Sequence, residues 1–283
     1  MKPLSRLTAI ALSAVALLAG AGTAFAGLGQ PSPWQIGLQD TATPIMDEIA
    51  GFNTYLTWLT TAIALFVLIL LAIIIVRFNA RANPTPSRTT HNTPLEITWT
   101  IVPVIILVSI AIPSFRLLFL ELNVPTPDLT LKATGKQWYW SYSYPDNGNF
   151  EFDSLVVADK DLKPGQPRLF TVDNQMVVPV NKVVHMLVTG ADVIHSFTVP
   201  SFGIRIDAIP GRINDTWFKA TTEGTYYGQC SELCGKDHAF MPISVQVMSD
   251  NDFTTWAAAA KQKFAGEQTA PANKFAAAGA SAQ

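Results

Sequence analysis

The chain has 283 residues, a net charge of −2 and two cysteines, and 49% of its residues are hydrophobic. Charged residues make up 14% of the chain, whereas about 25% is usual in soluble domains. This balance excludes a small domain held by many disulfides, shows no basic footprint for nucleic acid, and favours a membrane protein.

The first apolar stretch has the organisation of a secretory signal peptide. Lys2 and Arg6 form a positive start, residues 7–18 are apolar, and Ala24 and Ala26 give the small-residue pattern of a cleavage site. The sequence therefore predicts a signal peptide over residues 1–26 and an exported segment over residues 27–54. An uncleaved membrane anchor is the alternative, and the short apolar run counts against it.

Two longer apolar stretches can each cross a bilayer. Residues 49–76 carry no charge over 28 positions, and residues 97–115 carry none over 19, a helix length of about 28 Å. Pro103 and Pro113 should bend the second helix, which bundled membrane helices tolerate. We expect transmembrane helices over residues 55–78 and 96–120.

The charges around these helices predict their orientation. Arg77, Arg81 and Arg88 lie between the two helices, whereas acidic residues flank the outer ends. Because basic residues favour the cytoplasmic side, the loop over residues 79–95 is predicted inside and both termini outside. The export signal gives the same orientation independently.

Residues 121–256 have the pattern of an exported all-β domain. Turn residues separate short runs of β-forming residues, which is typical of a sandwich or barrel. The predicted strands are 129–134, 137–144, 168–173, 183–189, 196–199, 214–220, 224–227 and 243–248. Residues 121–255 contain sixteen acidic and ten basic residues, so their net charge is −6. This acidic excess favours a basic partner through electrostatic steering. The alternative is that the charges only keep the domain surface soluble. The Ala-rich segment over residues 257–283 is predicted to be a disordered tail.

Near the end of this domain, four residues of metal-ligand type fall within twelve positions. They are Cys230, Cys234, His238 and Met241, and His195 is a further candidate. Thiolate, imidazole and thioether together favour copper over zinc. Two thiolates allow two copper ions to share both sulfurs, each ion then needing one imidazole and one weak ligand. A disulfide and a zinc knuckle are the alternatives, and a disulfide would leave the spacing of the His and the Met unexplained.

The stretch from Cys230 to Met241 resembles the dinuclear copper (CuA) loop of cytochrome c oxidase subunit II, and a similar loop occurs in nitrous oxide reductases. The aromatic run over residues 137–144 and the segments 95–103 and 201–212 resemble further signatures of the oxidase family. The two predicted membrane helices favour the oxidase over the soluble reductase, and the cysteines favour it over the quinol oxidases, which lack copper ligands.

The resemblance, which covers roughly residues 55–256, is to subunit II of bacterial aa3-type haem–copper oxidases. It implies a two-helix transmembrane hairpin and a cupredoxin-like sandwich in the bacterial inner membrane, with both termini periplasmic. It also implies a translocase subunit that takes electrons from cytochrome c and passes them to the catalytic subunit I, which reduces oxygen while protons are translocated.

The resemblance also implies residue roles. Cys230 and Cys234 would bridge two copper ions, with His195 and His238 as terminal imidazoles. Met241 and the Glu232 carbonyl would be the weak ligands. Glu232 would also bind a magnesium or manganese ion that is shared with the catalytic subunit, and Asp207 would act on that ion through water. Trp138 would be the residue where electrons enter.

Two further implied roles depend on acidic residues. Glu96 would mark the mouth of a proton path, although an acid in the first turn of a helix also stabilises that helix. The expected cytochrome c docking residues are Asp159, Asp173 and Asp192. The chain departs from its relatives at Ser143 and Ala191, where several have an acid, which weakens the expected docking face.

A membrane-tethered copper carrier is the competing function. A carrier would also use Cys, His and Met, but it would need neither the aromatic run nor Glu96. A purple colour and an EPR signal shared by two copper nuclei would distinguish the electron-transfer subunit from the carrier.

Overall fold

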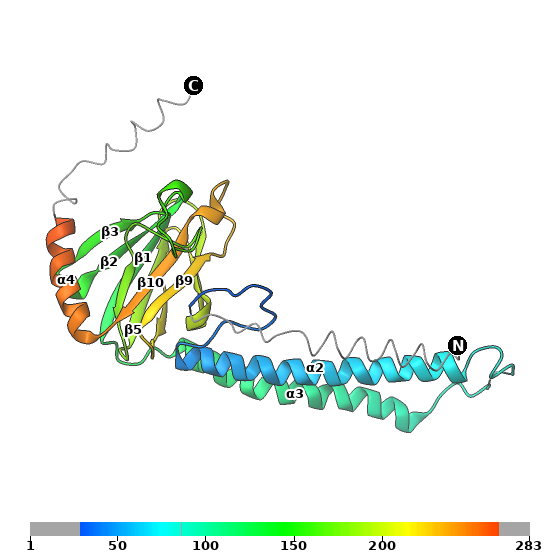
Figure 1. The fold of residues 1–283 in the computed structure, drawn as a ribbon. Coiled ribbons are helices and arrows are strands. Elements are labelled where there is room, and N and C mark those ends of the chain that lie inside the picture. The colour runs from blue at the N-terminus through cyan, green and yellow to red at the C-terminus, as the bar shows by residue number, and fades with distance from the viewer. Residues whose placement is uncertain (1–28, 86, 266–283) are drawn as a thin grey trace.

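The computed structural model describes residues 29–85 and 87–265, so the predicted signal peptide over residues 1–26 lies outside the described residues. Two long helices run side by side away from one end of a β-sandwich, and a shorter helix covers the sandwich on another side (Figure 1). This arrangement confirms the expected class of a two-helix hairpin joined to an all-β domain.

The two long helices, α2 (Pro44–Arg77) and α3 (Thr93–Leu122), each begin before the predicted start. Thr43 caps α2 by accepting a hydrogen bond from the Met46 backbone N–H, 3.1 Å away, and Pro44 occupies the first turn. The first turn of α2 precedes the uncharged stretch over residues 49–76, and Met46 lies against Gly203 of the β-domain. Each helix contains an apolar 18-residue stretch with no buried residue, as a membrane-spanning hairpin requires.

The start of α3 is closed by a reciprocal pair of hydrogen bonds. The Asn92 side chain accepts from the Leu95 N–H at 3.2 Å, and the Glu96 carboxylate accepts from the Asn92 N–H at 3.2 Å. With Asn92 at the N-cap, this pair is a variant of the capping box in which the acid stands one residue later than usual. Glu96 therefore has a structural role at this helix end, which is the helix-stabilising role that the sequence offered beside a proton path.

The β-domain, residues 129–248, consists of two five-stranded sheets packed face to face. The first has the order β3-β2-β1-β5-β8 and the second the order β4-β10-β9-β6-β7, with parallel pairs between β1 and β5 and between β4 and β10. The strands are β1 (Leu129–Lys136), β2 (Tyr139–Tyr144), β3 (Phe150–Ser154), β4 (Met176–Pro179), β5 (Val184–Gly190), β6 (His195–Val199), β7 (Ile204–Ala208), β8 (Asn214–Phe218), β9 (Gly224–Cys230) and β10 (Pro242–Met248).

Some of the strand predictions were wrong. Residues 168–173 form turns with one isolated bridge instead of a strand, and β3, β4 and β7 were missed. The predicted strand over residues 137–144 begins only at Tyr139, because Lys136 pairs with Tyr139 and the two residues between them form the hairpin turn. Beyond that turn, alternate side chains of β2, those of Trp140, Tyr142 and Tyr144, are buried in the core.

The β-domain is tied to the hairpin by hydrogen bonds. The Thr43 hydroxyl donates to the Phe202 carbonyl at 2.7 Å, and the Ala42 N–H donates to the Ser201 carbonyl at 2.9 Å. On the other helix, the Trp217 indole N–H donates to the Leu120 carbonyl at 3.1 Å. Each membrane helix is thus anchored directly to the domain that carries the candidate site.

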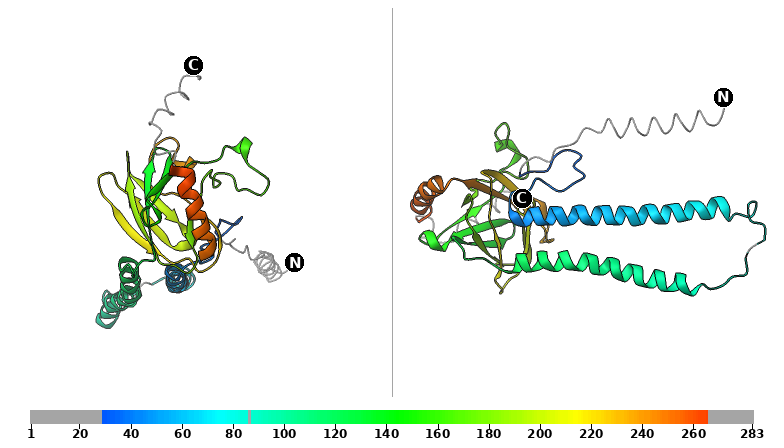
Figure 2. Two further views of the ribbon diagram at one scale, coloured as in Figure 1. Left: turned by 90° about the vertical axis from the view of Figure 1, so that its left-hand side faces the viewer. Right: turned by 90° about the horizontal axis from the view of Figure 1, so that it is seen from below.

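The C-terminal helix α4 (Asp250–Ala265) overturns part of the predicted disordered tail. Its residues Phe253, Ala257, Ala260 and Phe264 are buried, and the helix covers the side of the sandwich where β3 and β4, the edge strands of the two sheets, lie (Figure 1 and Figure 2). Phe264 stacks on Phe152 with ring centroids 4.7 Å apart. The Ala-rich composition that suggested disorder is also good helix-forming composition, and the aromatic residues supply the packing. Residues 266–283 lie outside the described part of the chain.

Candidate metal centre

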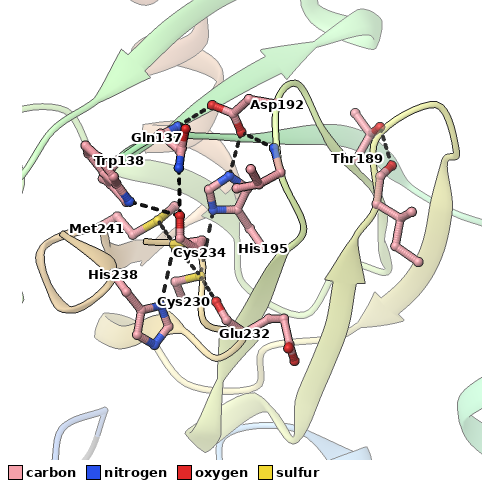
Figure 3. Close-up of polar contacts among 12 residues, drawn as sticks. Gln137, Trp138, Thr189, Asp192, His195, Cys230, Glu232, Cys234, His238 and Met241 are labelled. Carbon is pink, nitrogen blue, oxygen red and sulfur yellow. Dashed lines mark hydrogen bonds and ion pairs between the residues drawn. The ribbon is translucent and has the colours of Figure 1, made fainter. Parts of the chain in front are cut away.

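The metal-ligand residues meet at one end of the second sheet. His195 begins β6, Cys230 ends the antiparallel neighbour β9, and residues 231–241 form a loop that returns to β10. We call residues 231–241 the ligand loop. Because neighbouring antiparallel strands start and end at the same edge, residues 35 positions apart in sequence come together there (Figure 3).

The two cysteine sulfurs lie 3.8 Å apart and are buried as free thiols. A disulfide needs about 2.05 Å between its sulfurs, so the structure contradicts that alternative. A metal–thiolate bond is about 2.3 Å long, and an ion between these sulfurs could therefore touch both. Among the described residues, His195, Cys230 and Cys234 form the cluster of metal-binding groups, with ligand atoms within 4.8 Å of one another.

The remaining predicted ligands surround the two sulfurs. His195 Nδ1 lies 3.9 Å from Cys230 Sγ, and His238 Nδ1 lies 3.5 Å from Cys234 Sγ. Met241 Sδ, almost wholly buried, lies 3.5 Å from Cys234 Sγ. The Glu232 carbonyl oxygen lies 3.3 Å from Cys230 Sγ. Two thiols, two imidazoles, one thioether and one carbonyl thus converge, a soft donor set that fits copper.

Asp192 fixes the orientation of His195. The imidazole Nε2–H donates to Asp192 Oδ1 at 2.8 Å, which leaves Nδ1 directed at Cys230. The same carboxylate accepts the backbone N–H groups of Val193 and Gln137, each at 2.7 Å. Hydrogen bonds of this kind set the tautomer of a metal-binding histidine. Asp192, which the sequence predicts as a docking residue, also holds the His195 ring in place.

In the metal-free protein these contacts shift the pKa values of the site. Burial raises the pKa of the Asp192 carboxyl, but hydrogen bonds from His195 and two backbone N–H groups outweigh it and lower the pKa. Burial lowers the pKa of His195, yet its contacts with Cys230 and Asp192 raise it overall. Burial also raises the pKa of the Cys230 thiol, but hydrogen bonds, chiefly with His195, lower it to about 7. For Cys234, burial and the neighbouring Cys230 charge raise the pKa.

Trp138 contacts the ligand loop from the other sheet. Its indole N–H donates to the Cys234 carbonyl at 3.2 Å, and the side chain is half-buried. Lys236 lies 5.8 Å from the centre of the indole ring. A Cβ placed on Gly235 would come within 2.9 Å of this ring, so the absence of a side chain there permits the contact.

Two residues of the site were missed by the sequence reasoning. Gln137 donates its side-chain amide to the Cys234 carbonyl at 2.8 Å, beside the Trp138 indole. Gly135 lies against His195, since a Cβ there would come within 2.8 Å of the imidazole. The signal for Gly135 was available, because glycine inside a strand often marks a close approach. No local pattern indicated that the Gln137 side chain reaches across to the other sheet.

The other predicted residues lie away from the sulfur cluster. The exposed Asp159 pairs with Arg168 at 2.7 Å, and Asp173 accepts the Leu155 N–H at 2.8 Å. The Glu232 carboxylate points away from the sulfurs (Figure 3), with one oxygen 4.0 Å from Arg205. Asp207 lies in β7 and lines a surface hollow together with Arg205. Glu96 lies in the first turn of α3, at the end of the hairpin remote from the β-domain.

Comparisons with known proteins agree with this architecture. The family model "Cytochrome C oxidase subunit II, periplasmic domain" matches residues 129–248, and the model of the family's transmembrane domain matches residues 31–117. The chain is 52% identical over 236 residues to the probable cytochrome c oxidase subunit 2 of Rickettsia bellii, covering 83% of this chain and 88% of that one. It is 44% identical to cytochrome c oxidase subunit 2 of Phytophthora megasperma, covering 82% and 89%.

A crystal structure of the periplasmic domain of subunit II of cytochrome oxidase (CoxB) of Bradyrhizobium japonicum is 66% identical, with a TM-score of 0.48. The match covers 50% of this chain and 99% of that chain. Both family models and both full-length relatives lead to one conclusion. This chain belongs to the cytochrome c oxidase subunit II family.

Proposed function

We propose that this chain is the electron-accepting subunit of its oxidase and that its soft donor set holds two copper ions. Cys230 and Cys234 would be the bridging thiolates and His195 and His238 the terminal imidazoles. Met241 and the Glu232 carbonyl would be the weak ligands. The observation that carries the proposal is the pair of buried thiols 3.8 Å apart, with all four other donors around them.

Once bound, such a pair supplies reversible one-electron chemistry with the charge spread over two metals. The residues of this chain keep the donors in place. Asp192 holds the His195 ring, and the Gln137 amide and the Trp138 indole both hold the Cys234 carbonyl. Ligands fixed in advance by hydrogen bonds need little rearrangement when an electron arrives.

Trp138 would be the residue through which electrons enter from cytochrome c. Its side chain is partly exposed at the domain surface, and its indole N–H donates a hydrogen bond to the backbone carbonyl of Cys234, a proposed ligand. Docking of the cytochrome would use the acidic surface, for which Asp159 and Asp173 are exposed candidates. The acceptor would be the haem–copper catalytic subunit I, which reduces oxygen and translocates protons.

The wider setting follows from the same proposal. The hairpin would cross the bacterial inner membrane with its arginine-bearing loop in the cytoplasm and both termini in the periplasm. A magnesium or manganese ion would lie at the contact with the catalytic subunit, with the Glu232 carboxylate as one ligand and Asp207 acting through water. Within the described chain this carboxylate has Arg205 as its neighbour, so the ion would need ligands from the partner. An unaltered manganese EPR signal in a Glu232→Gln complex would remove Glu232 from that site.

The test of the copper proposal is spectroscopic. Copper added to the copper-free oxidase should give near-infrared and visible bands and an EPR signal with hyperfine coupling to two equivalent copper nuclei. Cys230→Ser should abolish that pattern, whereas Met241→Leu should keep it and shift the reduction potential, because an axial ligand tunes the potential. Binding of one copper ion without the shared EPR signal would favour a copper carrier instead.

A further inference from the structure

The hairpin has a groove between α2 and α3 at its domain end, remote from the metal ligands. Its volume is about 650 Å³, within the range of about 300–1,000 Å³ that is typical of small-molecule sites. The walls are mostly apolar and are formed by Gly51, Phe52, Pro113, Leu117 and Leu120. Two charged side chains, Glu48 and Arg116, line the same groove.

Because the two helices are antiparallel, Glu48 and Arg116 lie at the same height along the hairpin axis. The hydroxyls of Tyr55 and Ser109 form a hydrogen bond between the helices, 2.8 Å long, and both residues line the groove. Glu48 lies seven residues from Tyr55 toward the domain, and Arg116 lies seven residues from Ser109 in the same direction. Seven residues are close to two turns, about 10.5 Å, so both charges stand on the groove side above the Tyr–Ser bridge.

That level is the edge of the hydrocarbon layer. Glu48 directly precedes the 28 uncharged residues of α2, and Arg116 directly follows the 19 uncharged residues of α3. In the part of the chain that the structure describes, neither side chain forms an ion pair within 4.0 Å. An anion and a cation therefore face one groove at headgroup depth without neutralising each other.

From this arrangement we infer that the groove binds one phosphatidylethanolamine molecule from the leaflet on the domain side. The lipid phosphate lies against Arg116, whose guanidinium suits phosphate oxygens. The primary ammonium group lies against Glu48, and one acyl chain follows the apolar walls toward Tyr55. An anionic lipid would bring no cation to Glu48, and free phosphate would leave the apolar walls uncovered.

The test uses the purified oxidase complex containing the full chain, delipidated in detergent and offered equal amounts of phosphatidylethanolamine and phosphatidylglycerol. Native mass spectrometry counts the lipids retained per complex. Arg116→Gln should lower phosphatidylethanolamine retention at this site about tenfold, the effect of losing one hydrogen bond to a charged group. Glu48→Gln should reverse the preference toward phosphatidylglycerol, because only the cation then remains.

Gly51→Leu separates filling of the groove from loss of charge. A Cβ at Gly51 would meet nothing within 4 Å, so the helix accepts the substitution while the side chain occupies the groove, and one lipid per complex should be lost. Ala62→Leu adds similar bulk at an exposed position of α2, and Arg77→Gln removes a cation at its other end; both should retain the lipid. Undiminished phosphatidylethanolamine in Gly51→Leu and Arg116→Gln would overturn the inference. Release of the catalytic subunit by Gly51→Leu would also overturn it, because the groove would then be a subunit contact.

Discussion

A single carboxylate decides which nitrogen of His195 faces the sulfurs. Asp192 accepts the Nε2–H at 2.8 Å and so leaves Nδ1 for a metal. We expect Asp192→Ala to weaken copper binding by about 10–100-fold, the usual effect of losing such a support. Asp192→Asn should cost less, because its amide oxygen can still accept the Nε2–H.

Competition with a copper chelator measures this affinity in the detergent-solubilised oxidase. Asp159→Ala is the control, since it removes an exposed carboxylate that pairs with Arg168 away from the site. If Asp192→Ala binds copper as tightly as Asp159→Ala, the hydrogen bond to His195 does not support the metal.

The two thiols differ in proton affinity, which gives the metal-free site a distinct pH dependence. Hydrogen bonds, chiefly with His195 and then with the Ser196 and Glu232 backbone, outweigh burial and lower the pKa of Cys230 to about 7. Burial and the Cys230 charge raise the pKa of Cys234. Only the thiolate reacts with iodoacetamide, so the alkylation rate of Cys230, limited by its burial, should increase through pH 7 and fade as the pH falls below it. Cys234 should react slowly throughout this range.

Peptide mass spectrometry of the copper-free oxidase after timed alkylation distinguishes the two sulfurs. The Cys234→Ser variant isolates the Cys230 reaction and should retain a midpoint near neutrality. Preferential alkylation of Cys234 at pH 7 would contradict the assignment of the low pKa to Cys230.

At the scale of elements, the site depends on how closely β1 approaches β6. Gly135 in β1 would place a Cβ 2.8 Å from the His195 ring, and strands β1 and β6 belong to opposite sheets. Gly135→Ala must therefore push the start of β6 outward. We expect a loss of about 1–3 kcal/mol in the free energy of unfolding, typical of overpacking, together with weaker copper binding.

Thermal unfolding and copper titration of the same preparation measure both effects. Gly37→Ala is the matched control, because a Cβ at Gly37 meets nothing within 4 Å. Equal stability of the two variants would show that the sheets can separate at Gly135 without cost.

Local pattern sufficed for some elements and failed for others. The membrane helices and the ligand set could be predicted, because long apolar runs and a dense Cys-Cys-His-Met order are local signals. Strand β4 has four residues that are all buried and so lacks alternation, whereas β7 alternates but is only five residues long. Helix α4 was concealed by its Ala-rich composition. The contacts of Gln137 with Asp192 and with the Cys234 carbonyl join residues 55 and 97 positions apart, so they depend on both sheets having packed. The hydrogen bond between Asp192 and His195 spans only three positions.

At the scale of the whole molecule, the partly exposed Trp138 links the protein surface to the ligand loop. We expect Trp138→Gln to slow electron transfer from cytochrome c sharply while leaving its binding nearly intact. Asp173→Asn should do the opposite, lowering the association rate and its salt dependence, because an exposed charge mainly steers encounter. Stopped-flow reduction and binding at several salt concentrations separate the two. Equal effects of both substitutions on binding and transfer would refute this division of roles.

The end of the hairpin that holds Glu96 is separated from the candidate metal centre by the full length of α3. Any role of Glu96 therefore concerns protons instead of electrons. Its carboxylate accepts the Asn92 N–H and closes the capping box of α3, yet an ionisable group at a membrane boundary can also collect protons. Glutamine serves equally well in a capping box but cannot carry a proton.

We therefore expect Glu96→Gln and Glu96→Ala to slow steady-state oxygen consumption alike, with fast electron arrival at the copper centre in both. Glu96→Asp should retain part of the activity, since it keeps an ionisable group. The measurement is turnover of assembled complexes alongside stopped-flow reduction of the copper. Normal turnover in Glu96→Gln combined with a loss in Glu96→Ala would show that Glu96 only caps the helix. Neither variant can carry a proton at this position, and only Glu96→Gln keeps the capping hydrogen bond.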